Sequence, residues 1–264
     1  MDTKLTGKTR IESDLIGARE IPAEALYGVQ TLRGIENFSI SKFRLSEYPL
    51  FIKGLAITKM AAAMANFELG LLTVEQKDAI IAACGEIIDG KHHDQFPVDM
   101  IQGGAGTTTN MNANEVIANR ALELMGHERG EYQYTNDAYP TAIHIGMYFK
   151  HLQLLPHLEE LIASFRKKGE EFSRIIKMGR TQLEDAVPMT LGQTFNGFAS
   201  ILQDEIAHLN EAAADFLVVN MGATAIGTGI CAEPGYAEKC IAALREITGW
   251  DIRLSSDLVG ATSD

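Results

Sequence analysis

The chain has 264 residues, 46% hydrophobic and 22% charged, enough for one or two domains with a substantial buried core. Its formal net charge of −12 argues against nucleic acid or an anionic membrane surface as a partner. The three cysteines are odd in number and form no Cys-x-x-Cys pair, which favours free thiols in the cytoplasm over disulfides or a zinc site. No apolar run reaches the roughly 18 residues typical of a membrane span.

Two helices are expected after a mixed opening. Over residues 6–45, apolar, glycine and charged residues alternate without a regular period, so turns and short strands are expected. Apolar residues then follow helical spacing over 50–69. Thr73, with Gln76 three residues later, forms a capping box that opens a second helix ending near Gly90. Together they predict a helical hairpin.

The stretch GGAGTTTNMNANEVIANR, residues 103–120, joins a glycine-rich turn to an abrupt helix start. Its glycines free the backbone, and Thr107, Thr108, Thr109 and Asn110 supply short hydroxyl and amide side chains. A helix N-terminus presents unpaired N–H groups and a partial positive charge, which stabilise a bound anion. The stretch predicts a carboxylate site, but a cap by Thr109 after a plain glycine turn explains these residues equally well.

Long helices are expected in the second half of the chain. Apolar residues recur at helical intervals over 141–152, 156–176 and 189–219. The last run is far longer than the usual ~12-residue helix, and helices of such length are typical of bundles. The predicted fold class is mainly α: a small mixed N-terminal domain over 1–137, then the first part of a central multi-helix bundle domain over 138–264.

Three short polar islands interrupt the helical patterns, at residues 104–112, 135–137 and 179–182. Each is rich in Thr, Asn or Gln, whose side chains donate hydrogen bonds without bringing a competing charge. Several such donors converging on one carboxylate would hold it, and more tightly still as it gains negative charge in a reaction. Each island alone is better explained as a loop that caps neighbouring helices. Their joint occurrence is what predicts a site.

Two other patterns carry less functional weight. The sequence GATAIGTG, residues 222–229, lacks the third glycine of a dinucleotide fingerprint and the Gly-Lys of a P-loop, which disfavours nucleotide binding. His92, His93 and Asp94 are neighbours in sequence that point in different directions, and no ligand spacing of the zinc type follows. We expect an exposed turn there and predict no metal site.

The islands belong to longer runs that, in order, resemble the aspartase/fumarase superfamily. The resemblance is carried by FPVD with GTTTNMNANEVIANR, by TNDAYPTA, by GRTQLEDAVPMTLGQ and by the N-terminal IESDLIGAREIPAEALYGVQT. Within the superfamily, GTTTNMNANEVIANR and TNDAYPT look closer to the aspartate ammonia-lyases than to the fumarases, which usually show GTQSNMN and SNDTFPT there. The resemblance therefore implies the ammonia-lyase branch.

This resemblance implies a chemistry and a set of site residues. The reaction would be the reversible elimination of ammonia from L-aspartate to give fumarate through an enediolate, without an organic cofactor. Thr107 and Thr135 would bind the β-carboxylate of this dicarboxylate substrate, Thr181 the α-carboxylate, and Asn136 and Gln182 would lie near the amino group. The resemblance also implies a homotetramer with a core of long helices and with sites shared between subunits.

The chain departs from the superfamily pattern at two places. The loop GSSxMPGKVNP, which carries the catalytic serine of the superfamily, is not among these 264 residues, so the catalytic residue is unknown. A segment resembling HPNDHVNxSQS, usual just before TND, is missing as well, because residues 131–134 run straight into Thr135. We therefore expect a polypeptide truncated at its C-terminus and lacking a short internal segment.

Two rival interpretations stay open. Fumarate hydratase is the nearest, because neutral donors suit malate as well as aspartate; fumarases usually show His where Gln182 stands, which favours the ammonia-lyase. An inactive helical oligomerisation module, in which the polar islands serve only as caps, is the alternative of a different class.

Overall fold

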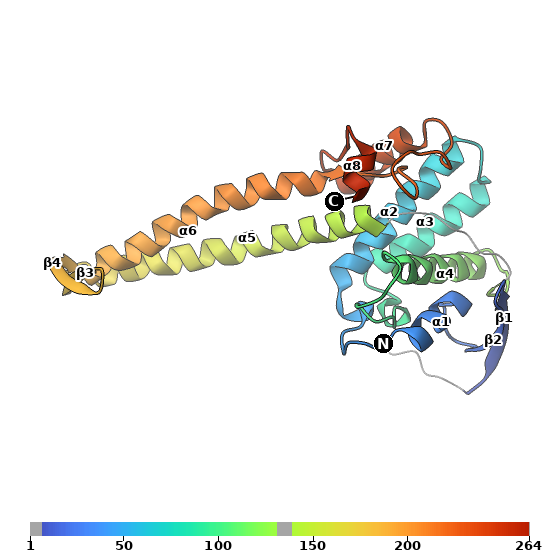
Figure 1. Cartoon of the computed structure of the whole chain (residues 1–264), viewed down its shortest axis with the longest axis horizontal. Helices are drawn as coiled ribbons and strands as arrows, with labels where there is room; N and C mark the ends of the chain where they lie inside the picture. The colour runs from blue at the N-terminus through green and yellow to red at the C-terminus, as the bar shows by residue number, and fades with distance from the viewer. Residues whose placement is uncertain (1–6, 131–138, 264) are drawn as a thin grey trace. The chain divides into compact units, whose positions relative to one another are not determined.

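The computed structural model describes residues 7–130 and 139–263. The chain divides into two compact units: Met1–Met147 with Leu217–Asp264, here unit 1, and Tyr148–Phe216, here unit 2. The described residues are mostly helical (Figure 1), which confirms the predicted mainly α class. The domain boundary predicted at residue 137 lies outside the described residues and stays a prediction.

Unit 1 opens with an antiparallel hairpin and a short helix: β1 (Thr9–Asp14), β2 (Gly17–Pro22) and α1 (Val29–Asn37). The hairpin turn is closed by Asp14, whose Oδ1 accepts hydrogen bonds from the backbone N–H groups of Ile16 and Gly17. An aspartate that bonds the backbone two and three residues ahead favours such a turn. The expected short strands and turns are therefore present.

Three helices form the centre of unit 1: α2 (Pro49–Glu68), α3 (Val74–Ile88) and α4 (Thr107–Leu124). Two 3-10 turns belong to the same region: η1 (Leu45–Glu47) precedes α2, and η2 (His93–Gln95) lies between α3 and α4. The predicted capping box is confirmed, because the Thr73 hydroxyl accepts from the Gln76 N–H and the Gln76 side chain accepts from the Thr73 N–H. α2 and α3 form the predicted helical hairpin.

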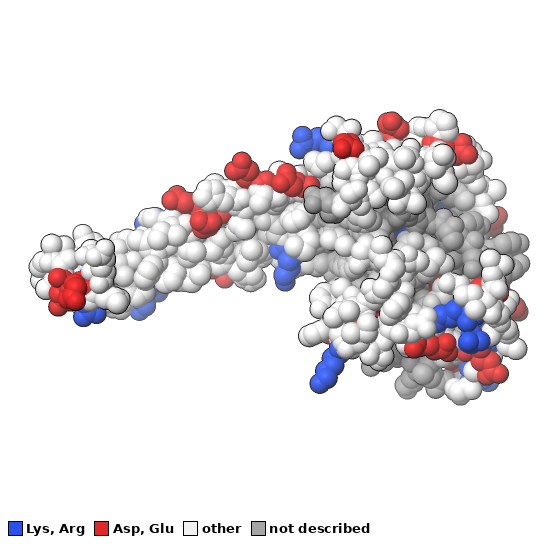
Figure 2. Space-filling view, in the orientation of Figure 1, with Lys and Arg blue, Asp and Glu red and all other residues white. Residues whose placement is uncertain are grey.

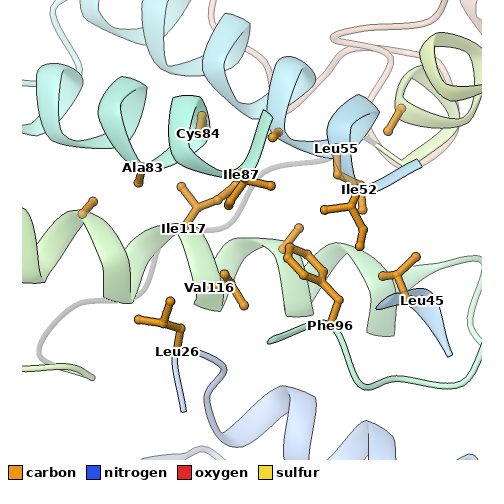
Figure 3. Close-up of a cluster of buried hydrophobic side chains, with 14 of the residues drawn as sticks. Leu26, Leu45, Ile52, Leu55, Ala83, Cys84, Ile87, Phe96, Val116 and Ile117 are labelled. Carbon is orange, nitrogen blue, oxygen red and sulfur yellow. The ribbon is translucent and has the colours of Figure 1, made fainter. Parts of the chain in front are cut away.

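Apolar side chains of these helices meet in one buried cluster (Figure 3). Ile52 and Leu55 come from α2, Ile87 from α3, and Val116 and Ile117 from α4. Removing such side chains from water is the main stabilising term in a fold of this size. The cluster fixes α4, and with it the glycine-rich turn that precedes α4.

By length and composition α2 could cross a membrane, although Lys53 and Lys59 interrupt its apolar pattern. Within the protein, 61% of its most apolar window is buried, so its hydrophobicity is explained by its place in the core.

The α5 helix (Tyr139–Glu171) begins in unit 1 and continues into unit 2. The apolar runs over 141–152 and 156–176 suggest two helices with a break at Pro156, but they form one helix with Pro156 inside it. Proline removes one helical hydrogen bond and frees the carbonyl four residues earlier, here that of Leu152. Leu152 is exposed, so water can satisfy that carbonyl and the helix continues.

Unit 2 is a long helical hairpin whose tip is a two-stranded sheet (Figure 1). It comprises the rest of α5, then β3 (Ile176–Thr181), β4 (Glu184–Thr190) and α6 (Leu191–Ala214). Phe165 and Phe172 of α5 pack their rings against Phe195 of α6, at centroid distances of 6.0 and 5.4 Å. The strands were not expected, because the island 179–182 was interpreted as a loop.

Unit 2 leaves large apolar side chains uncovered. Leu161, Met178, Val187, Phe198 and Ile201 are each 42–64% exposed. Figure 2 shows acidic side chains gathered along the region of α6, among a surface that is otherwise largely uncharged. Exposed apolar surface on this scale is typical of an interface with another chain.

The chain then returns to unit 1 through short elements: η3 (Asp215–Leu217), β5 (Val218–Val219), α7 (Tyr236–Thr248), β6 (Arg253–Leu254) and α8 (Leu258–Ser263). β5 and β6 pair in parallel, and α7 packs against α2. A salt bridge of 2.7 Å joins Lys239 of α7 to Glu68 of α2. The 222–229 segment lies between β5 and α7, and its Gly227 packs so closely on the Val259 backbone that an added Cβ would clash with it. Close packing thus explains this glycine.

Candidate active site

The start of α4 presents Thr107 at the surface. Gly106, at φ +83, precedes the helix and supplies no side-chain cap. The Thr107 hydroxyl donates to the Gly104 carbonyl at 2.7 Å and is exposed. A hydroxyl group can rotate to another acceptor, so the Thr107 hydroxyl could donate to a bound carboxylate instead of to the Gly104 carbonyl. Thr107 thus lies, as predicted, at a helix N-terminus that favours an anion.

The three threonines have three different environments. Thr108 packs against α1, where a Cβ added to Gly34 would clash with the Thr108 Cγ2. Thr109 is buried and its hydroxyl accepts from the Gln102 amide at 2.8 Å. The interpretation of Thr109 as a simple helix cap is therefore wrong, because the side chain that accepts from the backbone N–H of this turn is that of Gln102.

A buried lysine contacts the first turn of α4. Lys59 of α2 is 6% exposed, and its Nζ donates to the Asn110 Oδ1 at 2.7 Å. Asn110 lies three residues after Thr107 and so on the same face of α4. A cation held there raises the electrostatic potential for an anion at the helix start. Sequence reasoning missed Lys59, although a charged residue within the apolar pattern of 50–69 was a signal.

Tyr139, the residue that follows 131–138, lies against this helix start. Thr135 and Asn136 lie within residues 131–138, outside the described residues. The described chain resumes at Tyr139, whose ring lies directly over Gly106: an added Cβ there would be 2.5 Å from two ring carbons. Phe51 of α2 contacts the Tyr139 ring edge-on, with the ring centroids 5.6 Å apart. The structure therefore brings the end of this sequence block against the residue before Thr107.

Thr181 and Gln182 lie together at the exposed tip of unit 2: Thr181 ends β3, and Gln182 begins the turn to β4. Gln182 and Leu183 have φ of 49° and 70°. Positive φ at both central residues is typical of a type I′ turn, which normally takes Asn-Gly. A left-handed conformation costs a non-glycine residue about 1–2 kcal/mol, so this turn is strained. Leu183 is 95% exposed. Thr107 belongs to the other compact unit.

The buried carboxylate of the 103–120 stretch has a structural role. Glu115 is 4% exposed and accepts hydrogen bonds from the backbone N–H groups of Gly28, Gln30 and Thr31, at 2.7–2.9 Å. It thereby satisfies the N-terminal amides of α1, which carry a partial positive charge. Burial raises the pKa of Glu115, and these hydrogen bonds oppose the rise.

The histidine-containing turn is partly buried rather than exposed. His92 bonds Glu86 through Nε2 at 2.8 Å, and His93 Nε2 bonds the Ile87 carbonyl at 2.9 Å. Both rings therefore anchor η2 to α3. Across residues 7–130 and 139–263, no group of three His, Cys, Asp or Glu side chains is arranged to hold a metal ion.

Comparisons with known proteins now give the family. A sequence profile described as Lyase matches residues 17–264. Aspartate ammonia-lyase of Pseudomonas canavaninivorans is 54% identical over 268 residues, covering 97% of this chain and 56% of the relative. The enzyme of that name from Escherichia coli strain K12 is 50% identical over 273 residues, covering 98% and 57%. The chain thus spans little more than half the length of these relatives.

Solved structures agree with the sequence comparisons. A fumarate lyase:delta crystallin from Brucella melitensis bound to cobalt superposes with a TM-score of 0.93 at 49% identity, covering 97% of this chain and 58% of that one. A class II fumarase from Schistosoma mansoni superposes with a TM-score of 0.88 at 31% identity, covering 96% and 59%. The chain is a member of the lyase family, within the aspartase/fumarase superfamily. Its curated relatives at 50–54% identity are aspartate ammonia-lyases, which confirms the predicted resemblance.

Proposed function

We propose that this chain belongs to an aspartate ammonia-lyase, an enzyme that reversibly eliminates ammonia from L-aspartate to give fumarate. The observation that carries the proposal is the start of α4, where an exposed Thr107, a glycine without a side chain at the N-cap position and the Lys59–Asn110 pair favour a carboxylate. Identities of 50–54% to aspartate ammonia-lyases support it. In chemical terms, the site needs donors whose hydrogen bonds strengthen as charge develops.

The proposed reaction places that charge on the β-carboxylate. A base removes a proton from Cβ, and the bonding electrons move into the carboxylate to form an enediolate with one additional negative charge. The electrons then return to form the double bond between Cα and Cβ, the Cα–N bond breaks, and the protonated amine leaves with that bonding pair as ammonia. Preorganised neutral donors and a nearby cation stabilise the enediolate more than the ground-state carboxylate. The base is assigned to no residue of this chain, and no organic cofactor is needed.

The remaining roles are proposed from the resemblance. Thr107 and Thr135 bind the β-carboxylate, Thr181 binds the α-carboxylate, and Asn136 and Gln182 lie near the amino group. Binding sites normally bury most of a small ligand, whereas Thr181 and Gln182 lie at an exposed tip. A second surface must therefore close over them. We propose that another subunit of a homotetramer supplies it, through the uncovered apolar residues of unit 2.

We further propose that the protein is cytoplasmic and has neither nucleic acid nor a membrane as a partner. The net charge of −12 supports the absence of such partners, and the three free cysteines, Cys84, Cys231 and Cys240, support the cytoplasm.

The test uses the natural polypeptide that contains this chain and follows fumarate by its absorbance. We expect Thr181→Val to lower kcat/KM for L-aspartate at least about a hundredfold, because a donor that binds charge is lost. Thr181→Ser retains the hydroxyl and is the matched control, expected to keep most of the activity. Wild-type turnover in Thr181→Val would remove Thr181 from the site.

Fumarate hydratase is the second candidate, favoured by the 31% identity to the Schistosoma mansoni fumarase. It predicts faster turnover of L-malate than of L-aspartate. The inactive oligomerisation module predicts neither activity, and no binding of succinate, a dicarboxylate that cannot react. Succinate binding that Thr107→Val abolishes would exclude the module.

A further inference from the structure

The segment before α4 is anchored by a buried carboxylate. Asp99 is fully buried and accepts four hydrogen bonds, from the N–H groups of Ile40, Ser41 and Ile101 and from the Ser41 hydroxyl, at 2.6–2.9 Å. The Ser41 hydroxyl and these amides hold the pKa of Asp99 at about 2, below its usual 3.8. Asp99 thus joins two separate loops into one rigid support.

Gln102 connects this support to the helix. Its Nε2 donates to the Asp99 carbonyl at 2.7 Å and to the Thr109 hydroxyl at 2.8 Å, and its Oε1 accepts from the Thr109 N–H at 2.9 Å. A primary amide has two donors and one acceptor oxygen, and all are used. No other side chain of this length offers the same set: glutamate lacks the donors, and leucine lacks both.

This arrangement moves the helix cap away from its usual place. A capping Ser, Thr or Asp normally precedes the helix and covers the N-terminal amides with its own oxygen. Here that position is Gly106, which has no side chain, and the capping oxygen comes from Gln102 four residues earlier. An oxygen at position 106 would compete with a substrate carboxylate for the helix start. The cap at Gln102 instead leaves Thr107 exposed.

We propose that Gln102 is a positioning residue for the carboxylate site: by holding Thr109, it fixes the first turn of α4 and thereby the direction of the Thr107 hydroxyl. The inference rests on the proposed function and deepens it, because it assigns the geometry of the β-carboxylate subsite to a residue that does not touch the substrate. Tyr139 over Gly106 secures the other side of the same turn.

The test compares two amide-to-acid changes in the natural polypeptide. Gln102→Glu keeps the acceptor and removes the donors. Asn119→Asp does the same at the other end of α4, where the Asn119 amide donates to the Leu26 carbonyl and its oxygen accepts from the Gly130 N–H, both at 2.7 Å. We expect both variants to lower Tm, but only Gln102→Glu to lower kcat/KM for L-aspartate at least about tenfold, because it loses the donors that hold the first turn of α4.

The pH profile separates positioning from general destabilisation. In Gln102→Glu, protonation of the introduced carboxylate restores one donor, so the ratio of variant to wild-type kcat/KM should rise as the pH is lowered from about 8 to about 6. Gln102→Leu should show no such recovery. Equal losses in Gln102→Glu and Asn119→Asp, or a Gln102→Glu enzyme within about twofold of the wild type, would overturn the inference.

A second measurement does not depend on the reaction. Amide hydrogen exchange at residues 104–110 should accelerate at least about tenfold more in Gln102→Glu than in Asn119→Asp, and Thr109→Val provides a milder variant if Gln102→Glu does not fold. Unchanged exchange in a folded variant would refute the positioning role. If the wild-type protein converts no L-aspartate but the two variants show this difference in exchange, the proposed function is contradicted and the positioning role of Gln102 is not.

Discussion

Gly106→Ala tests the contact between Tyr139 and the start of α4. Gly106 has φ +83, and an added Cβ would be 2.5 Å from ring carbons of Tyr139. The left-handed backbone costs alanine about 1–2 kcal/mol. Forcing a methyl group against the ring costs about 1–3 kcal/mol more. We therefore expect the free energy of unfolding to fall by about 2–5 kcal/mol in total, a large share of the usual stability of a domain.

Gly126→Ala is the matched control, because Gly126 has φ +82 and nothing within 4 Å of an added Cβ. It should show the backbone cost alone. Equilibrium unfolding in urea measures both variants, and an unchanged m-value shows that stability alone has changed. Tyr139→Ala should recover part of the loss in a double-mutant cycle. Equal destabilisation by Gly106→Ala and Gly126→Ala would refute the packing of Tyr139 on the start of α4.

Two further predictions concern titratable groups. Cys231 is exposed, whereas burial raises the pKa of both Cys84 and Cys240 to about 12. A thiol reagent at a pH of about 8 should therefore label Cys231 rapidly and the other two only on unfolding. A rapidly labelled thiol in Cys231→Ser would contradict this prediction. Hydrogen bonds from Arg120 lower the pKa of Glu86 from 4.5 to about 2. Because that pKa is depressed, its stabilising contribution is present above pH 4.5 and is lost as pH falls towards 2. Tm should therefore fall over this window less steeply in Glu86→Gln, and identical slopes would disprove the contribution.

The sequence predicted the features that depend on local chemistry. The capping box at Thr73 follows from side chains that bond their own neighbouring backbone. The family followed from blocks of residues in order, which carry more information than any periodicity. The mainly α class followed from long helical patterns.

Features set by tertiary context could not be predicted from the sequence. The β3–β4 turn has Gln182 and Leu183 in left-handed conformations, where the usual Asn-Gly signal is absent. Proline usually breaks a helix, but Pro156 lies inside α5, because an exposed helix tolerates the lost hydrogen bond. Gln102 reaches Thr109 across seven residues, and no local capping pattern describes that bond. Lys59 was hidden within an apolar helical pattern.

The central claim is that the fold and the α4 site serve the elimination of ammonia from L-aspartate. The most direct measurement is kcat/KM of the natural polypeptide for L-aspartate and for L-malate, each followed by fumarate absorbance under the same conditions. We predict that L-aspartate is the better substrate by at least about a hundredfold, as expected where a site is built for one leaving group. Faster turnover of L-malate, or no turnover of L-aspartate, would contradict the claim.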